Sequence, residues 1–124
     1  MRELTAEPIE MTAFAPYGQV LSDPGPGNRS DYAAQVSNGW PGIDINLAVV
    51  RAIPPEKFPI EVTKMERHPL SSQAFLPLDC DRYLVIAALP QGKDGPPDLS
   101  TLRAFIAPGQ AGINYNAGTW HYPL

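Results

Sequence analysis

Residues 65–77 read M-E-R-H-P-L-S-S-Q-A-F-L-P and predict two strands joined by a tight turn. Strand alternation places Glu66 and His68 on the same sheet face. A proline then ends the first strand because it lacks an amide N–H, and residues 69–72 have the length of a hairpin loop. We therefore expect His68 to lie opposite Gln73, so that an acid, an imidazole and an amide share one face.

Short strands and frequent turns are predicted along the rest of the chain. A short helix is expected over residues 11–18, where Thr12 can cap the amino end and Gly18 can end the helix. Residues 43–53 alternate and then become apolar throughout, which is typical of a strand that enters a barrel or sandwich core. The expected strands cover residues 3–9, 19–21, 33–36, 43–53, 60–68, 75–78, 83–89, 101–107 and 112–124.

Composition supports an all-β fold in one domain over residues 1–124. The chain has 15 prolines and 10 glycines, which favour many turns over long helices. Eight or nine short strands with almost no helix predict a small β-barrel or sandwich.

Charge and hydropathy exclude several classes of function. The net charge of −4 and the pI near 5.0 argue against nucleic acid as a partner. The sequence also has no cluster of Lys and Arg that would bind an anionic membrane. Residues 84–89 form the longest apolar run, far short of the roughly 20 residues that span a bilayer. The first 14 residues are too acidic for a signal peptide. The lone Cys80, expected to be buried, cannot form an internal disulfide, so we expect a cytoplasmic protein.

His68, Gln73, Glu66 and His121 form the main candidate site. Two imidazoles, a carboxylate and an amide can together hold a divalent metal such as Ni, Mn, Fe or Zn. The alternative is that His68, which precedes a proline at a strand end, is only a turn residue. The metal interpretation requires the segment around His121 to fold back onto the predicted hairpin.

Three further residues are candidates for binding a substrate. Arg103 shares a predicted strand face with Phe105, and if that face lines a barrel interior, the guanidinium can bind a substrate carboxylate. If the face is solvated, Arg103 has no such role. Asn114 and Tyr115 offer hydrogen bonds near His121.

Two segments resemble the metal-binding motifs of cupins. Glu66-x-His68, followed after four residues by Gln73, takes the place of the first motif. The second motif is matched at Gly118 and His121. More specifically, the chain resembles the ureidoglycolate lyase family, formerly called ureidoglycolate hydrolases. The resemblance rests on A-F-A-P-Y-G (13–18), E-R-H-P-L-x-x-Q-A-F-x-P (66–77), D-L-S-T-L-R-A-F-I (98–106) and G-I-N-Y-x-x-G-T-W-H-x-P-L (112–124).

This resemblance implies a cupin-like β-barrel or jelly roll of short antiparallel strands with one short N-terminal helix, commonly a homodimer. It also implies cleavage of (S)-ureidoglycolate to glyoxylate and urea in allantoin and purine degradation, with nickel as the named cofactor. Family members often have histidines where this chain has Asn116 and Tyr122, and they continue beyond the block that ends at Leu124. We therefore expect a chain that is shortened at its C-terminus.

The resemblance suggests a role for each candidate. His68 or Glu66 would be the base, His121 the acid and Arg103 the carboxylate anchor, with Gln73 in a positioning role. If a metal is bound, His68, Gln73, Glu66 and His121 become its ligands. The alternatives are a non-catalytic cupin that binds a small carboxylate and a metal-dependent cupin enzyme of another reaction type.

Overall fold

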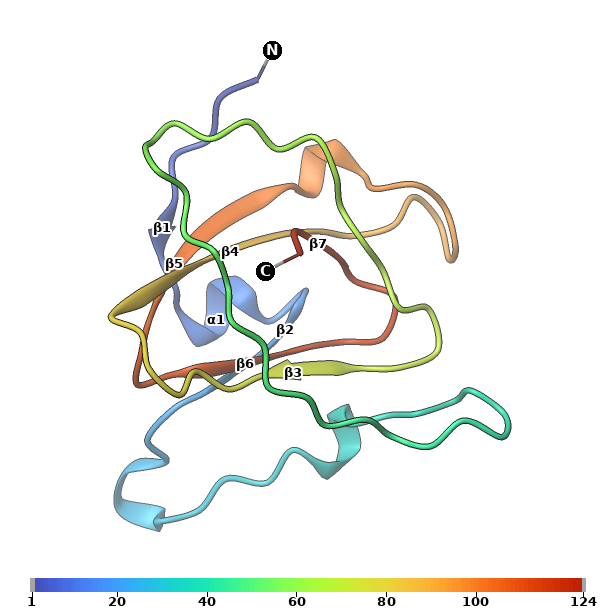
Figure 1. Ribbon diagram of the computed structural model, residues 1–124. Coiled ribbons are helices and arrows are strands. Elements are labelled where there is room, and N and C mark those ends of the chain that lie inside the picture. Colours follow the sequence, from blue (N-terminus) through green and yellow to red (C-terminus); the bar gives the residue numbers. More distant parts are fainter. Residues whose placement is uncertain (1, 124) are drawn as a thin grey trace.

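A computed structural model describes residues 2–123 and shows two β-sheets with the helix α1 (Met11–Phe14) between them (Figure 1). The prediction of an all-β fold with one short N-terminal helix is confirmed. One sheet has the order β1 (Glu7–Pro8), β5 (Arg103–Pro108), β4 (Arg82–Ala88) and β7 (Trp120–His121). The other has the order β2 (Gly18–Leu21), β6 (Gly112–Tyr115) and β3 (Gln73–Phe75). Short 3₁₀ turns cover Gly25–Gly27, Ala33–Gln35 and Leu99–Thr101.

The core forms where α1 meets the inner faces of both sheets. Phe14 of α1 is fully buried and packs edge-on against Phe105 of β5, with ring centroids 5.6 Å apart. Phe105 lies directly opposite Val85 of β4, and directly opposed residues share a sheet face. Ile113 and Tyr115 of β6 complete the core from the other sheet. This arrangement buries the apolar face of each sheet against the other, as layered β-folds require.

The prediction of a buried strand over residues 43–53 is wrong. The segment forms no strand and runs as a long trace across the front of both sheets in the view of Figure 1. Its apolar side chains are solvent-exposed, with Ile45 84%, Leu47 95% and Val49 84% exposed. A strand requires a hydrogen-bonding partner as well as an alternating pattern, and no sheet in residues 2–123 pairs with this segment.

The predicted hairpin around residues 69–72 is also wrong. The strand β3 pairs with β6, and in the expected strand over residues 60–68 only Glu66 forms a bridge, to His121. The loop residues instead pair with residues 37–39, because the Gly39 amide donates to the Leu70 carbonyl at 2.7 Å. The Glu66 segment therefore faces the last strand of the chain and not its sequence neighbour.

Several smaller predictions need correction. The segment expected as a strand at residues 33–36 contains a 3₁₀ turn. The N-cap of α1 is Glu10 and not Thr12. The strand β1 is only two residues long and pairs in parallel with β5, an exception to the expected antiparallel pairing. Cys80 is exposed and not buried.

The strands predicted at residues 19–21, 83–89 and 101–107 correspond to β2, β4 and β5. Among the described residues, no helix has the length and apolar character needed to cross a membrane.

Candidate active site

Backbone pairing between two distant segments creates the candidate site. The Glu66 amide donates to the His121 carbonyl at 2.8 Å, and the His121 amide donates to the Glu66 carbonyl at 2.9 Å. The Gly118 amide also donates to the His68 carbonyl, at 2.9 Å. Alternation around this bridge points Glu66, His68 and His121 to the same side. The C-terminal segment thus folds back as the sequence-based site requires, although it does so by direct pairing.

These three side chains form a compact donor cluster, which we call the triad (Glu66, His68 and His121). The His121 Nε2 atom lies 3.2 Å from Glu66 Oε1, and His68 Nε2 lies 4.0 Å from the same oxygen. All three potential ligand atoms lie within 4.8 Å of one another. His121 is buried, whereas the side chains of His68 and Glu66 are 37% and 42% exposed. His121 therefore forms the buried part of the triad, and His68 and Glu66 form its solvent-accessible part.

The neighbours of His121 determine which ring nitrogen carries the proton. Its Nδ1 lies 3.1 Å from the Thr119 carbonyl, which can only accept, so Nδ1–H donates this hydrogen bond. The neutral ring then directs the Nε2 lone pair toward Glu66. Burial lowers the pKa of His121, while the Thr119 carbonyl and the carboxylate of Glu66 oppose part of that shift. A lone pair that faces a carboxylate needs a proton or a cation between them.

Two aromatic rings fix the plane of His121. Tyr115 stacks on the imidazole with ring centroids 4.3 Å apart and an interplanar angle of 11°. Phe75 stands at 70° to the imidazole, 6.5 Å away, and at 81° to Tyr115. Burial raises the pKa of Tyr115, which stays a neutral phenol at physiological pH. The imidazole ring of His121 therefore cannot rotate far without displacing these two core side chains.

The donor set fits a divalent cation. His68 Nε2 and Gln73 Oε1 are buried without a hydrogen-bond partner among the described residues, and buried polar atoms are normally satisfied. Gln73 lies directly opposite Tyr115 in the β3–β6 ladder and so shares its face. Two imidazole nitrogens, a carboxylate and an amide oxygen suit Ni, Mn, Fe or Zn.

Two expected substrate-binding residues do not join the triad. Asn114 lies on the opposite face of β6 from Tyr115, and its Nδ2 donates to Gln19 Oε1 at 2.7 Å. Arg103 is on the inner face with Phe105, but its guanidinium pairs with Glu7 at 2.8 Å. Arg103 thus already has an anionic partner at the edge strand β1.

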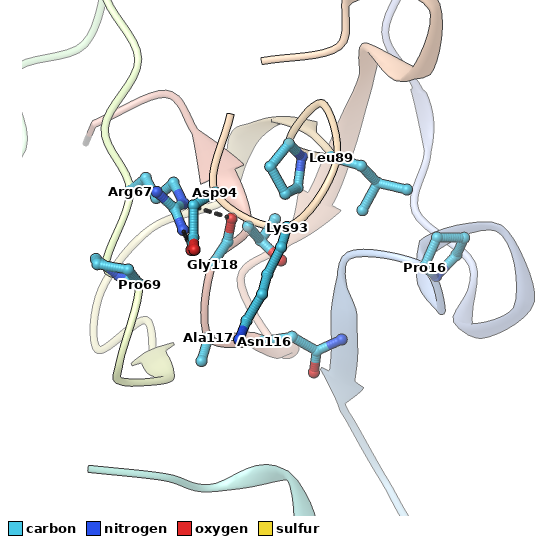
Figure 2. Close-up of a pocket in the computed structure, with 11 residues that line it drawn as sticks. Pro16, Arg67, Pro69, Leu89, Lys93, Asp94, Asn116, Ala117 and Gly118 are labelled. Atoms are coloured by element: carbon cyan, nitrogen blue, oxygen red, sulfur yellow. Dashed lines mark hydrogen bonds and ion pairs between the residues drawn. The ribbon is translucent and has the colours of Figure 1, made fainter. Parts of the chain in front are cut away.

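A cavity of about 310 Å³ lies on the other side of the Glu66 segment, beside Arg67, and Figure 2 shows its lining. None of the triad residues lines it. The residues lining it are Pro16, Arg67, Pro69, Leu89, Pro90, Lys93, Asp94, Asn116, Ala117, Gly118 and Thr119.

Sequence reasoning missed two contributors to the site. Thr119 acts through its backbone carbonyl, so its residue type gave no signal. Phe75 was expected to start a strand, and alternation from Gln73 could have placed it on the site face.

Comparison with known proteins identifies the family of the chain. The family model for ureidoglycolate lyase matches residues 1–124. A ureidoglycolate lyase from Pseudomonas paraeruginosa strain PA7 is 38% identical over 137 residues, which cover 100% of this chain and 76% of that protein. One from Pseudomonas fluorescens strain Pf0-1 is 37% identical over 133 residues, covering 100% and 77%. One from Escherichia coli O1:K1 / APEC is 34% identical over 134 residues, covering 98% and 79%. These matches confirm the resemblance seen in the sequence blocks, and the chain belongs to the ureidoglycolate lyase family.

Proposed function

We propose that this protein is a ureidoglycolate lyase, which cleaves (S)-ureidoglycolate to glyoxylate and urea in allantoin degradation. The observation that carries the proposal is the triad together with two buried polar atoms, His68 Nε2 and Gln73 Oε1, which have no hydrogen-bond partner among the described residues. Unsatisfied polar atoms beside an accessible side are what a small polar substrate would satisfy.

The main chemical requirement of the reaction is proton transfer. The substrate is a hemiaminal whose C2 carries a hydroxyl, a carboxylate and a urea nitrogen. The O–H bond breaks as C=O forms, and the C–N bond breaks as the urea nitrogen gains a proton. No oxidant or second substrate is needed, so a base, an acid and a carboxylate anchor are sufficient.

The triad supports a specific division of these roles. His68 or Glu66 takes the hydroxyl proton, since both side chains are partly exposed. His121, which presents Nε2 toward Glu66, accepts that proton through the carboxylate and returns it to the departing urea nitrogen. Positioned proton transfer of this kind typically contributes about 10²- to 10⁴-fold.

Gln73 and Tyr115 are the proposed partners of the substrate carboxylate. Gln73 and Tyr115 lie directly opposite each other in the β3–β6 ladder, and the Tyr115 ring stacks on His121. An amide N–H and a neutral phenol can each donate a hydrogen bond to a carboxylate. Arg103 was the sequence-based anchor, and in this proposal it stays with Glu7.

The same residues would hold a metal cofactor. Glu66, His68, His121 and Gln73 are the proposed ligands, and nickel is the metal that the family resemblance implies. A bound divalent cation would polarise the substrate hydroxyl and lower its pKa.

We also propose that the enzyme is a cytoplasmic homodimer. The segment of residues 43–53 exposes six large apolar side chains by 60 to 95% each, and such a patch is typical of an interface. The exposed free thiol of Cys80 suits a reducing compartment.

The first experiment supplies racemic ureidoglycolate to the purified protein and follows glyoxylate release against the spontaneous rate, with and without chelator and added nickel. We expect glyoxylate to be released from only one enantiomer of ureidoglycolate. Release that survives chelation supports metal-free proton transfer, and release that chelation abolishes and nickel restores supports a metal site.

Substitution of His68 by alanine should lower turnover at least a hundredfold without unfolding the protein. Leu70→Ala is the control, because Leu70 lies in the adjoining loop and is 44% exposed. Absence of release above background would contradict the proposal, and glyoxylate binding without turnover would then indicate a non-catalytic carboxylate-binding protein.

A further inference from the structure

Arg67 lies between two triad residues in sequence but points away from them. Because alternation directs Glu66 and His68 to the site, the Arg67 side chain extends to the reverse side, where it is only 12% exposed. Figure 2 shows it at the edge of the cavity, with contacts to Asp94 and Gly118. The proposed reaction assigns no role to this largely buried cation.

The guanidinium joins three separate segments of the chain. Its Nε donates to the Gly118 carbonyl at 3.2 Å, and a terminal nitrogen pairs with Asp94 at 2.9 Å. The same group lies 5.9 Å from the ring centroid of Trp120. Trp120 in turn donates from Nε1 to the Gly95 carbonyl at 3.1 Å, which attaches the turn that carries Asp94.

The site needs such a connection because its backbone pairing is short. The Glu66–His121 contact is an isolated bridge, supported by one additional hydrogen bond between Gly118 and His68. Gly118 has a φ of 85°, a conformation that favours glycine. Its carbonyl accepts the hydrogen bond from Arg67. A guanidinium can donate in a fixed plane and stack on an aromatic ring at once, which an ammonium cannot do.

We propose that Arg67 is a positioning residue that holds the Glu66–His68 segment at a fixed spacing from the Gly118–His121 segment. It acts from the reverse side through Gly118, Trp120 and Asp94, and so maintains the separation between His68 and His121. This proposal rests on the proposed function only for its kinetic consequence. Because a displacement of about 1 Å can cost on the order of 10²-fold in rate, loss of Arg67 should reduce turnover while substrate binding changes little.

The test compares Arg67→Met with Arg29→Met. Arg29 also pairs with an aspartate, Asp31 at 3.0 Å, but on an exposed surface loop, so this control removes an Arg–Asp ion pair of similar length away from the triad. The first readout is the cross-peak between the ring protons of His68 and His121 in a nuclear Overhauser spectrum. The two rings are 5.4 Å apart, and the chain has 2 histidines, so assignment is direct.

In Arg67→Met we expect this cross-peak to weaken at least twofold and kcat to fall at least tenfold, with KM within about threefold of the wild-type value. Arg67→Lys should give intermediate values, because it keeps the charge near Asp94 but loses the planar donor. An unchanged cross-peak with kcat within twofold of the Arg29→Met control would overturn the proposal.

A second variant covers the case in which Arg67→Met does not fold. Asp94 is 69% exposed, so Asp94→Asn should fold while it removes the ion pair, and we expect a smaller loss of the cross-peak in it. A cross-peak equal to that of Arg29→Met would then count against the proposal. If the wild-type protein does not turn over ureidoglycolate, the proposed function fails, and the cross-peak alone still decides the role of Arg67.

Discussion

The two ring nitrogens of His121 have different tasks because their neighbours differ. Nδ1–H donates to a backbone carbonyl, which fixes the tautomer without using any functional side chain. Nε2 is left to face Glu66 and the rest of the triad. A buried histidine would normally be an inert core residue, but this arrangement keeps one nitrogen available for a proton or a metal.

Burial of His121 predicts that acid destabilises the fold. Folding lowers the pKa of His121. As the pH falls, His121 is therefore protonated first in the unfolded chain, where its pKa is near 6.5. The contribution of His121 to the free energy of unfolding is therefore fully present above pH 6.5 and is lost as the pH falls toward the folded-state pKa. Urea denaturation at pH 8 and pH 5, in the presence of a chelator, measures this difference.

His121→Phe should reduce the difference between the two pH values, because phenylalanine has no proton to gain. His68→Asn serves as the control and should keep most of it. An equal pH dependence in wild type and His121→Phe would show that other groups cause the acid instability.

Between sheet strands, close approach of two backbones places a strict limit on side-chain size. A Cβ atom added at Gly18 of β2 would lie 1.9 Å from the carbonyl oxygen of Asn114 on β6. Gly27 provides a matched control, because nothing lies within 4 Å of an added Cβ there. Gly18 is directly opposite Tyr115, so a shift here would reach the ring that stacks on His121.

We therefore expect Gly18→Ala to lower the free energy of unfolding by about 1–3 kcal/mol, the usual cost of overpacking, and to reduce turnover. Gly27→Ala should stay within about 0.5 kcal/mol of wild type. Chemical denaturation measures both, and equal stability of the two variants would contradict the close approach of β2 and β6.

The sequence predicted the strands correctly where the structure provides each of them with a hydrogen-bonded partner strand. The strands β2, β4 and β5 follow their predicted ranges because each pairs along its length with another strand. Residues 43–53 carry an equally strong alternating pattern, yet pattern alone does not provide a pairing partner. The structure brings Glu66, His68 and His121 close together, as the sequence predicted, although the predicted hairpin is wrong. Partner choice is a property of the whole chain.

At the scale of the molecule, the exposed segment of residues 43–53 is the main surface that a second subunit could cover. Six large apolar residues of this one segment are 60 to 95% exposed. Isolated exposed apolar residues are common in monomers, but a contiguous run of this kind is not.

We expect Leu47→Asp to convert the proposed dimer to a monomer, because a buried aspartate at the interface would be unpaired. Leu99→Asp is the control, since Leu99 is 56% exposed on a different part of the surface. Light scattering after size-exclusion chromatography measures the mass of each variant. A wild-type monomer, or a dimer that persists in Leu47→Asp, would contradict the proposed interface.

The five strand ladders share one property that bears on how the protein is made. Each of them includes β5, β6 or β7, and these three strands all lie between residues 103 and 121. A nascent chain on the ribosome therefore has no sheet to form until this region emerges, because β1 to β4 do not pair with one another. Such non-local pairing is typical of slow folding. Until then the apolar side chains of the first hundred residues have no sheet to pack into, which makes a folding chain prone to aggregation.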